Sequence, residues 1–347
     1  MKESTKRAIC SSLHYSGLSA LAGMFSTGRG AIFYLHRVLP VEQPTDFAPN
    51  RPYSVSPETL RALIEYVLAA GFEVISLSEM RERLIAKAAR KKFVCLTFDD
   101  GYIDTMEYAQ PVCAEFDVPM TVYIPTGLID GSVEAWWYGL EELVAANDEV
   151  RFVHRGHEVC YETASVAQKQ AAYGEIELMF RALSVKECTE LIAALESRHK
   201  VSFGALSRAQ FMDWDQLCAL AGRDKVEIGA HTKSHTALNT LSDAAARDEI
   251  EGGWRILQER LGRPVTHFAY PYGDADTTGE RDFGLCKELG FATATTTLAG
   301  VLRPEHKAAL HSLPRLPIWT DEAPATIAPK LSGAFELMLK LRASNAA

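Results

Sequence analysis

The stretch FVCLTFDDGY, residues 93–102, predicts a buried strand that runs directly into two carboxylates and a glycine. Adjacent residues of a regular strand point to opposite faces of the sheet. Asp99 and Asp100 can therefore serve one site only if the strand ends there, and Gly101 permits such a break in the backbone. One aspartate could then bind a metal ion while the other acts as a base. Taken alone, the pair is more often a simple turn in which an aspartate caps the following helix.

Strand-like and helical patterns alternate on both sides of this stretch. Besides residues 93–98, we expect strands at 31–35, 73–77, 120–124, 226–230, 266–270, 291–296 and 313–318. The helical patterns fall at 57–70, 105–116, 243–261 and 280–289. Such alternation predicts an α/β protein with a parallel sheet and helices outside it. About eight strands suit a closed or nearly closed (β/α) barrel, and a hydrophobic content of 47% supports one sizeable core.

One segment interrupts this alternation, and we interpret it as a helical insertion in the barrel. Between about residues 131 and 210 the only strand-like run is 151–161, and helical patterns cover 164–181 and 185–198. The alternation resumes afterwards, and neither flank alone supplies enough strands for a barrel. The 347 residues allow either two ordinary domains or one barrel of about 250 residues with additions. We expect a helical N-terminal segment, one barrel with the insertion and a C-terminal helix, at residues 1–29, 30–322 and 323–347.

The overall charge and the cysteines exclude several classes of protein. The chain carries 36 basic and 45 acidic residues, a net charge of −9, which argues against a nucleic-acid-binding protein with a basic surface. The seven cysteines are scattered and form no C-x-x-C pair, so we expect neither a disulfide scaffold nor a cysteine-bound zinc ion. No apolar run approaches the ~20 residues that span a bilayer.

The N-terminus bears on the location of the protein. Lys2, Lys6 and Arg7 precede a mildly apolar stretch at residues 18–25, which serines and glycines interrupt and which has no clear cleavage site. We therefore expect an amphipathic helix here rather than a signal peptide. The resulting expectation is a cytoplasmic protein, which cell fractionation would test.

Two further polar clusters also follow predicted strands directly. In HTKSH, residues 231–235, two histidines four residues apart would lie on one face of a helical turn and can hold one divalent ion, for which zinc suits imidazole. In FAYPYGD, residues 268–274, the strand must turn at once and expose backbone N–H groups that can bind an oxyanion. Taken singly, each has a simpler explanation: one core and one surface histidine, or a plain aromatic turn. All three clusters fall at the C-terminal ends of strands, the edge at which parallel α/β barrels carry their active sites.

Together and in this order, the three clusters resemble the motifs of the polysaccharide deacetylase family, also called the NodB-homology or carbohydrate esterase 4 family. TFDDGY (residues 97–102) and HTKSH match its first two motifs closely, and FAYPYG is similar to its third. AIFYLHRV (residues 31–38) and residues 54–77 also look like the N-terminal part of many members. The resemblance runs from about residue 30 to residue 320 outside the insertion. It implies a distorted (β/α) barrel of the NodB-homology type, which agrees with the alternation described above.

The resemblance also implies a chemistry. The family's enzymes are metal-dependent hydrolases, and the resemblance implies an N- or O-deacetylase of a polysaccharide or oligosaccharide, with N-acetyl groups favoured. Removal of an N-acetyl group leaves a free amine on the sugar. Carried over by position, Asp100, His231 and His235 would hold the divalent ion, most often zinc. Three protein ligands leave an open position for water and the acetamide oxygen. Asp99 would be the general base, and the Tyr272 backbone N–H would help to stabilise the tetrahedral oxyanion.

Two departures from the family's pattern concern the groups around the base and the leaving amine. The third motif often carries an arginine that pairs with the base, but Ala269 stands at the matching place. Arg315, near the end of another predicted strand, is our candidate for that guanidinium. The fifth motif normally supplies a Leu-x-His whose histidine protonates the amine, and His311 comes near it, shifted by one residue. His311 is thus a candidate general acid, with a surface loop histidine as the alternative. Without a general acid, the amine could take the proton that Asp99 removes from the metal-bound water. The motif that supplies Asp and Trp to the pocket is not recognisable.

Several residues stay open between a role in the site and a structural one. His36 ends the first strand and would either line the site or cap the barrel. Trp136 and Trp137 could stack on sugar rings, although a buried anchor for the insertion is the favoured interpretation. Trp319 has the same ambiguity.

Two alternatives to a glycan deacetylase also stay open. A non-catalytic carbohydrate-binding relative would keep the barrel, but it would not need both a base and three metal ligands. A relative that hydrolyses a non-sugar amide, such as a ureide or an imide, often loses part of the histidine pair, which is intact here. The expected partner is therefore an acetylated glycan or amino sugar, and the lack of a clear signal peptide favours an intracellular precursor or oligosaccharide.

Overall fold

Seven parallel strands close into a ring in the computed structural model, which describes residues 3–25, 28–41, 45–86, 91–320 and 322–346. The strands are Gly30–Leu35 (β1), Phe93–Phe98 (β5), Met120–Ile124 (β6), Val226–Ala230 (β9), His267–Ala269 (β10), Thr293–Ala299 (β11) and Leu313–Pro317 (β12). Around the ring the order is β5, β1, β12, β11, β10, β9 and β6, and β6 pairs with β5 again. β1 and β5 pair along their whole length, from Gly30 opposite Phe93 to Leu35 opposite Phe98. The expected (β/α) barrel is therefore present, and all its strands end at one edge.

The strand expected at residues 73–77 is much shorter and lies outside the ring. Only Glu73–Val74 (β4) is extended, and it pairs with the first two residues of β5. The side chain of Ser76 accepts a hydrogen bond from the backbone N–H of Glu79, so the helix Leu77–Ile85 (α4) begins where we expected the strand to end. The barrel consequently closes with seven strands instead of about eight.

Helices cover the outside of the barrel. Pro57–Ala69 (α3) begins at a Ser56 cap, and Glu280–Leu289 (α13) ends at Gly290, whose φ is +86°. The helix expected over 105–116 is divided into a π-helical turn, Thr105–Ala109 (η2), and Gln110–Glu115 (α5). The other helices of this layer are Thr126–Asp130 (α6), Trp214–Ala221 (α11) and Asp243–Leu261 (α12). Shorter elements are Arg37–Val38 (β2), Arg51–Tyr53 (η1), Ser54–Val55 (β3), Leu238–Thr240 (η3) and Pro304–Ala308 (η4).

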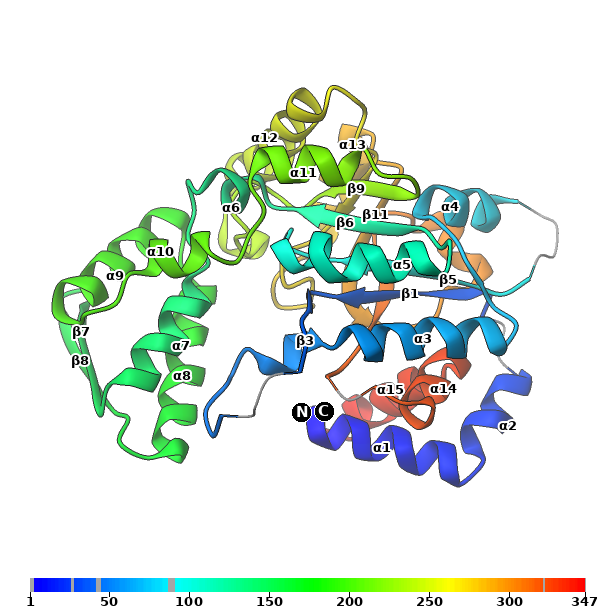
Figure 1. The fold of residues 1–347 in the computed structure, drawn as a ribbon, viewed down its shortest axis with the longest axis horizontal. Helices are drawn as coiled ribbons and strands as arrows, with labels where there is room; N and C mark the ends of the chain where they lie inside the picture. The colour runs from blue at the N-terminus through cyan, green and yellow to red at the C-terminus, as the bar shows by residue number, and fades with distance from the viewer. Residues whose placement is uncertain (1–2, 26–27, 42–44, 87–90, 321, 347) are drawn as a thin grey trace.

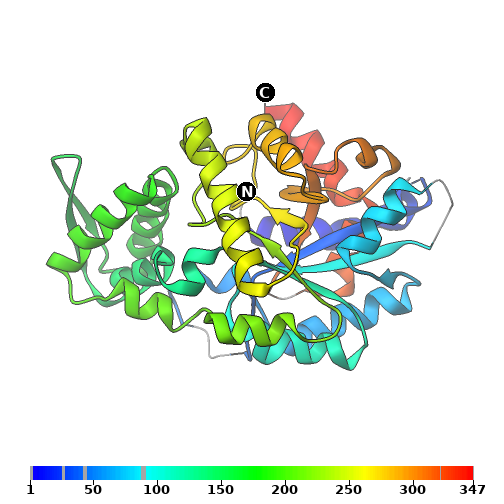
Figure 2. The same ribbon diagram turned by 90° about the horizontal axis from the view of Figure 1, so that it is seen from above.

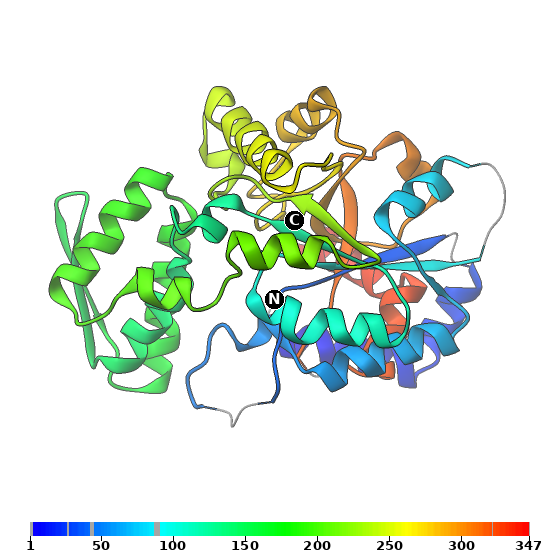
Figure 3. The same ribbon diagram turned by 45° about the horizontal axis from the view of Figure 1, so that its top comes forward.

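The residues between β6 and β9 include a lobe beside the barrel, at the left of Figure 1 and also visible from above and obliquely in Figures 2 and 3. Its elements are Trp136–Ala146 (α7), Glu149–His154 (β7), His157–Glu162 (β8), Val166–Arg181 (α8), Val185–Arg198 (α9) and Phe203–Arg208 (α10). The strand-like run at 151–161 is an antiparallel hairpin, because β7 and β8 pair along their whole length. The lobe has its own apolar core, which includes Phe152, Ile176 and Leu195. It is thus a folded unit that can present a rigid surface to the barrel.

The two ends of the chain pack together on one side of the barrel (Figure 1). Each end forms two helices where we expected one: Glu3–Tyr15 (α1) and Leu18–Phe25 (α2), then Pro324–Ser332 (α14) and Ala334–Ala346 (α15). The buried Lys330 pairs with Glu322 and lies 3.5 Å from the ring centre of Trp319. Trp319 is therefore a packing residue at this end of the molecule. Within the described ranges, no helix is long and apolar enough to cross a membrane.

Candidate active site

The strand β5 ends at Phe98, and the two carboxylates after it turn toward one cavity. Asp100 and Gly101 both take left-handed backbone conformations, with φ of +75° and +74°, so the alternation of the strand stops at Asp99. A Cβ at position 101 would lie 2.8 Å from the Cδ1 atom of Ile124, and the left-handed backbone also disfavours any other residue there. Asp99 and Asp100 are both buried, and both line the same cavity. The break that we expected at Gly101 thus begins one residue earlier, at an aspartate for which this conformation is costly.

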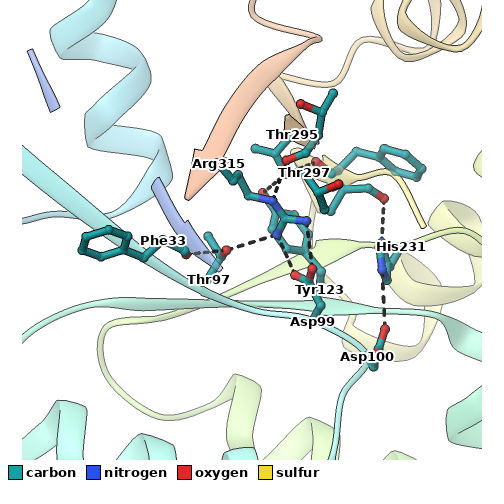
Figure 4. A network of polar contacts seen from close by, with 12 residues as sticks. Phe33, Thr97, Asp99, Asp100, Tyr123, His231, Thr295, Thr297 and Arg315 are labelled. Atoms are coloured by element: carbon teal, nitrogen blue, oxygen red, sulfur yellow. Dashed lines mark hydrogen bonds and ion pairs between the residues drawn. The ribbon is translucent and has the colours of Figure 1, made fainter. Parts of the chain in front are cut away.

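Arg315 of β12 holds Asp99 from inside the barrel (Figure 4). Its Nη1 and Nη2 atoms donate to the two carboxylate oxygens over 2.7 and 2.8 Å, which makes a bidentate pair. Nη1 also donates to Thr97 Oγ1 over 3.2 Å, and Nε donates to the carbonyl oxygen of Thr296 over 2.9 Å. Burial alone would raise the pKa of Asp99, but Arg315, together with His231 and His36, holds the pKa below its usual value. The guanidinium that the third motif lacks is thus present beside Asp99, from the strand that we expected to supply it.

The two histidines of the HTKSH cluster meet at Asp100, but they do not lie on a helix. Thr232 and His235 have φ of +63° and +55°, and the segment after β9 is a loop. Thr232 Oγ1 accepts a hydrogen bond from the His235 N–H over 3.0 Å, and Glu249 of α12 accepts two more from backbone N–H groups of the loop. These bonds fold the loop so that the Nε2 atoms of His231 and His235 lie 3.5 and 3.2 Å from Asp100 Oδ1. The expected helical turn is wrong, because side-chain caps close the same five residues as a loop.

This arrangement of a carboxylate and two imidazoles fits a divalent metal ion. One ligand atom from each of Asp100, His231 and His235 lies within 4.8 Å of the others. His231 Nδ1 donates to the carbonyl oxygen of Ala269 over 2.7 Å, which leaves the lone pair of its Nε2 directed toward Asp100. Asp100 Oδ1 and His235 Nδ1 are buried, and no described residue forms a well-aligned hydrogen bond with either atom. Burial alone would raise the pKa of Asp100, but the two histidines hold it well below its usual value. An ionised buried carboxylate that faces two imidazole nitrogens is the ligand set that zinc prefers.

The Pro-Tyr-Gly turn after β10 lies beside this cluster. Tyr272 and Gly273 are left-handed, with φ of +59° and +66°. Thr297 of β11 fixes the turn, because its Oγ1 donates to the Tyr272 carbonyl over 2.6 Å and its N–H donates to the Gly273 carbonyl over 2.9 Å. The centroid of the Tyr272 ring is 5.0 Å from that of His235. Within the described part of the chain, no group accepts a hydrogen bond from the Tyr272 N–H, so this donor is available to a ligand.

Comparison of the chain with known families decides what these three clusters are. A family profile described as Polysaccharide deacetylase matches residues 86–173 and 174–291, which together are more than half of the chain. The chain belongs to the polysaccharide deacetylase family. It is accordingly a hydrolase that acts on carbon–nitrogen bonds, as the resemblance implied. A comparison with curated proteins found no match.

Solved structures of other deacetylases have the same fold. The deacetylase PplD of Streptococcus pyogenes, solved in complex with acetate, superposes with a TM-score of 0.58 at 17% identity, over 87% of this chain and 97% of that one. For IcaB of Ammonifex degensii the TM-score is 0.53 at 17% identity, over 87% and 97% of the chains. A de-N-acetylase of Aggregatibacter actinomycetemcomitans gives 0.57 at 14% identity, over 87% and 99%. At such low identity, these likenesses establish the barrel fold and nothing finer.

His311 does not reach the active site of this deacetylase. It precedes β12, and its Nε2 donates to the carbonyl oxygen of Phe291 over 2.8 Å. Phe291 precedes β11 in the same way, so both residues lie at the N-terminal edge of the barrel. Our assignment of His311 as general acid is therefore wrong. The sequence places it near a strand, but at the end opposite to the site.

His36 occupies the cavity instead. It follows β1 directly, at the C-terminal edge of the barrel, and it lines the same cavity as Asp99 and Asp100. Burial lowers the pKa of His36, and the nearby Asp100 and Asp99 carboxylates offset part of this effect. Of the two roles that the sequence left open, the structure thus favours a position in the site. The signal that marks it is the one that marked the other clusters, a polar side chain immediately after a buried strand.

The inserted lobe forms one wall of the cavity. Trp136 and Trp137 at the start of α7 are nearly buried, and both line the cavity. The centroid of the Trp137 ring lies 5.5 Å from that of His235. Arg181, the last residue of α8, donates to Asp274 Oδ2 over 2.7 Å, and its guanidinium lies 4.8 Å from the centre of the Tyr272 ring. The tryptophans thus anchor the lobe and line the site at once, and the lobe contacts the turn whose N–H is available to a ligand.

Proposed function

We propose that this enzyme removes acetyl groups from sugar residues of a glycan, with N-acetyl groups as the principal substrate. The observation that carries this proposal is the convergence of Asp100, His231 and His235 beside the Asp99–Arg315 pair in one cavity of about 430 Å³. A cavity of this volume accommodates a sugar residue. The fold shared with proteins described as deacetylases and as a de-N-acetylase supports the same reaction.

Asp100, His231 and His235 would hold a divalent ion, zinc foremost, and a bound ion there would polarise the acetamide carbonyl and lower the pKa of a water molecule. Asp99 would accept the proton of the attacking water, a role worth roughly 10²–10⁴-fold in rate. Arg315 keeps Asp99 ionised and fixes its plane, while each carboxylate oxygen retains a second lone pair for that proton.

Two further groups of the cavity would act on the oxyanion and on the leaving nitrogen. The unpaired Tyr272 N–H would donate to the oxyanion as the carbonyl carbon becomes tetrahedral. The departing nitrogen must gain a proton, because an amide ion is too poor a leaving group. Because burial favours the neutral form of His36, this residue, which lines the same cavity as the base, would take up the proton that Asp99 removes from the water and pass it to the nitrogen. The products are acetate and a sugar with a free amine.

The test is to measure bound metal and acetate release together. The wild-type protein is incubated with N-acetylated chito-oligosaccharides and acetylated polysaccharide, and His235→Ala serves as the comparison. We expect stoichiometric metal and acetate release from the wild type, with both strongly reduced in the variant. Stoichiometric metal without hydrolysis of any acetylated glycan or small amide would point to a carbohydrate-binding relative. A wild-type protein that binds no metal would refute the assignment of the ligands.

A further inference from the structure

One face of the inserted helix α8 is turned toward the catalytic cavity. Tyr173, Glu177 and Arg181 are spaced by four residues, so they project from the same side of the helix. All three line the cavity that also holds Asp99 and Asp100. Part of the polar lining of the cavity therefore comes from the insertion and not from the barrel.

Two of these three side chains already have partners. The Tyr173 hydroxyl donates to Asn50 Oδ1 over 3.1 Å, and Arg181 is paired with Asp274. Glu177 differs from them, because no residue in the described ranges makes a hydrogen bond or an ion pair with its carboxylate. Its side chain is nevertheless half-buried, and burial raises its pKa although Arg181 partly offsets the effect. A half-buried carboxylate with no partner in the protein has acceptor capacity that a ligand can satisfy.

We propose that Glu177 is a specificity-determining residue whose carboxylate accepts hydrogen bonds from hydroxyl groups of the sugar chain bound in the cavity. The inference rests on the proposed deacetylase function and deepens it. An ionised carboxylate is an acceptor with two oxygens, which matches a pair of neighbouring sugar hydroxyls. Arg181, one helical turn away, is already paired with Asp274, so the Glu177 carboxylate keeps its acceptor capacity for a ligand.

A pair of substrates separates sugar recognition from chemistry. Triacetylchitotriose carries the hydroxyls, whereas 4-nitrophenyl acetate carries an acetyl group and no sugar. The variants are Glu177→Ala and Glu177→Gln, with Glu190→Ala as the matched control. Glu190 lies on α9 of the same lobe, its side chain is 64% exposed, and it forms a 3.8 Å ion pair with Lys186. The thermal melting temperature of each variant is measured alongside.

For Glu177→Ala we expect kcat/KM on triacetylchitotriose to fall roughly 10–100-fold, mainly through KM, because a charge-assisted hydrogen bond to the substrate is lost. Glu177→Gln should lose less, since its amide oxygen remains an acceptor. Both variants should hydrolyse 4-nitrophenyl acetate as the wild type does, and Glu190→Ala should be unchanged on both substrates.

Three results would overturn the assignment. A Glu177→Ala enzyme with wild-type KM and kcat on the sugar would reject the role of Glu177 and leave the deacetylase function intact. Glu177→Ala and Glu177→Gln could instead lose kcat/KM equally, while the wild type acts better on partly deacetylated than on fully acetylated oligosaccharide. That result would mean that the carboxylate binds an ammonium group. A wild-type enzyme inactive on every acetylated sugar would reject the proposed function itself.

Discussion

Asp99 and Asp100 are neighbours in the chain, yet each has its own electrostatic partner. Asp99 is paired with Arg315, whereas Asp100 faces His231 and His235. Both carboxylates are buried, so burial would raise the pKa of each without such a partner. The left-handed residue between the strand and the loop is what directs two consecutive side chains to two different partners in one cavity. This division allows one carboxylate to bind an ion while the other carries a proton.

Replacing Arg315 by methionine should impair proton transfer and spare metal binding. Without the guanidinium, burial would raise the pKa of Asp99, so the base would be protonated up to a higher pH. The acidic limb of the kcat/KM profile should therefore move to higher pH, and kcat near neutrality should fall by about 10²–10⁴-fold. Acetate release measured across the acidic and neutral range, together with metal analysis, checks both parts.

Two controls accompany this variant, because an unpaired buried carboxylate also costs about 3–5 kcal/mol of stability. Arg315→Lys keeps the charge without the bidentate geometry, so its kcat should lie between those of the wild type and Arg315→Met. Arg303→Met removes another arginine–carboxylate pair, with Glu336, away from the cavity. Wild-type turnover in Arg315→Met would remove Arg315 from the mechanism.

His36→Ala should distinguish a proton donor from a residue that only lines the cavity. An amide nitrogen must be protonated as it leaves, whereas 4-nitrophenolate leaves as a stable anion. We expect about a 10²–10⁴-fold loss of kcat on an N-acetyl sugar and a much smaller loss on 4-nitrophenyl acetate. Parallel loss on the amide and the ester, measured at equal metal content, would contradict this role.

Residues that directly follow a buried strand were the predictable part of the site. Asp99, Asp100 and His231 share this feature, and the order of the barrel strands brings them to one edge. His36 has the same feature, but as a lone histidine it has no spacing partner to indicate its use. His311 was wrongly assigned because it precedes the last strand, and a residue before a strand lies at the edge of the barrel opposite to the site.

At the scale of elements, the insertion contributes to the site as much as any barrel helix does. Its helix α8 carries Tyr173, Glu177 and Arg181 along one face of the cavity. The sequence predicted this helix well, at 164–181 against the observed Val166–Arg181. The direction of its polar face was not predictable, because it depends on how the lobe packs against the barrel, through Trp136 and Trp137. The HTKSH loop is a similar case, since a spacing of four residues is compatible with a helix and with a capped loop.

Arg181→Met should loosen the turn that presents the Tyr272 N–H. The lost ion pair with Asp274 is partly exposed, with side chains 27% and 42% accessible, so the stability cost should stay within about 1 kcal/mol. Small misplacement of a catalytic group lowers the rate steeply, and we expect kcat to fall by about tenfold to a hundredfold. KM, bound metal and melting temperature should change little.

Arg198→Met is the matched control for that experiment. Arg198 lies on α9 of the same lobe and forms an exposed ion pair with Glu158, away from the cavity. A loss of kcat in both variants would mean that the effect comes from the lobe as a whole. A loss confined to KM in Arg181→Met would mean that Arg181 binds substrate and does not position the turn.

At the scale of the molecule, ring closure is what assembles the site. His36 follows β1, and Arg315 lies in β12, yet β1 pairs with both β12 and β5 and so closes the ring between the two ends of the barrel. Asp100 precedes the insertion and His231 follows it, and the direct pairing of β6 with β9 brings the flanks together across the base of the lobe. The sequence predicted one barrel around an insertion because a shared metal site requires both flanks. The number of strands was less predictable, since β4 is extended for two residues only.

A metal ion held across the base of the lobe should stabilise the whole fold. Its ligands come from both flanks of the insertion, and the unfolded chain does not bring them together. An ion at 100 times its Kd contributes about 2.7 kcal/mol to the free energy of unfolding. Thermal melting after chelation should therefore occur several degrees lower, and added zinc should restore it. His235→Ala should abolish this difference, whereas His311→Ala, at the opposite edge of the barrel, should retain it. An equal zinc-dependent shift in His235→Ala would place the stabilising ion elsewhere in the molecule.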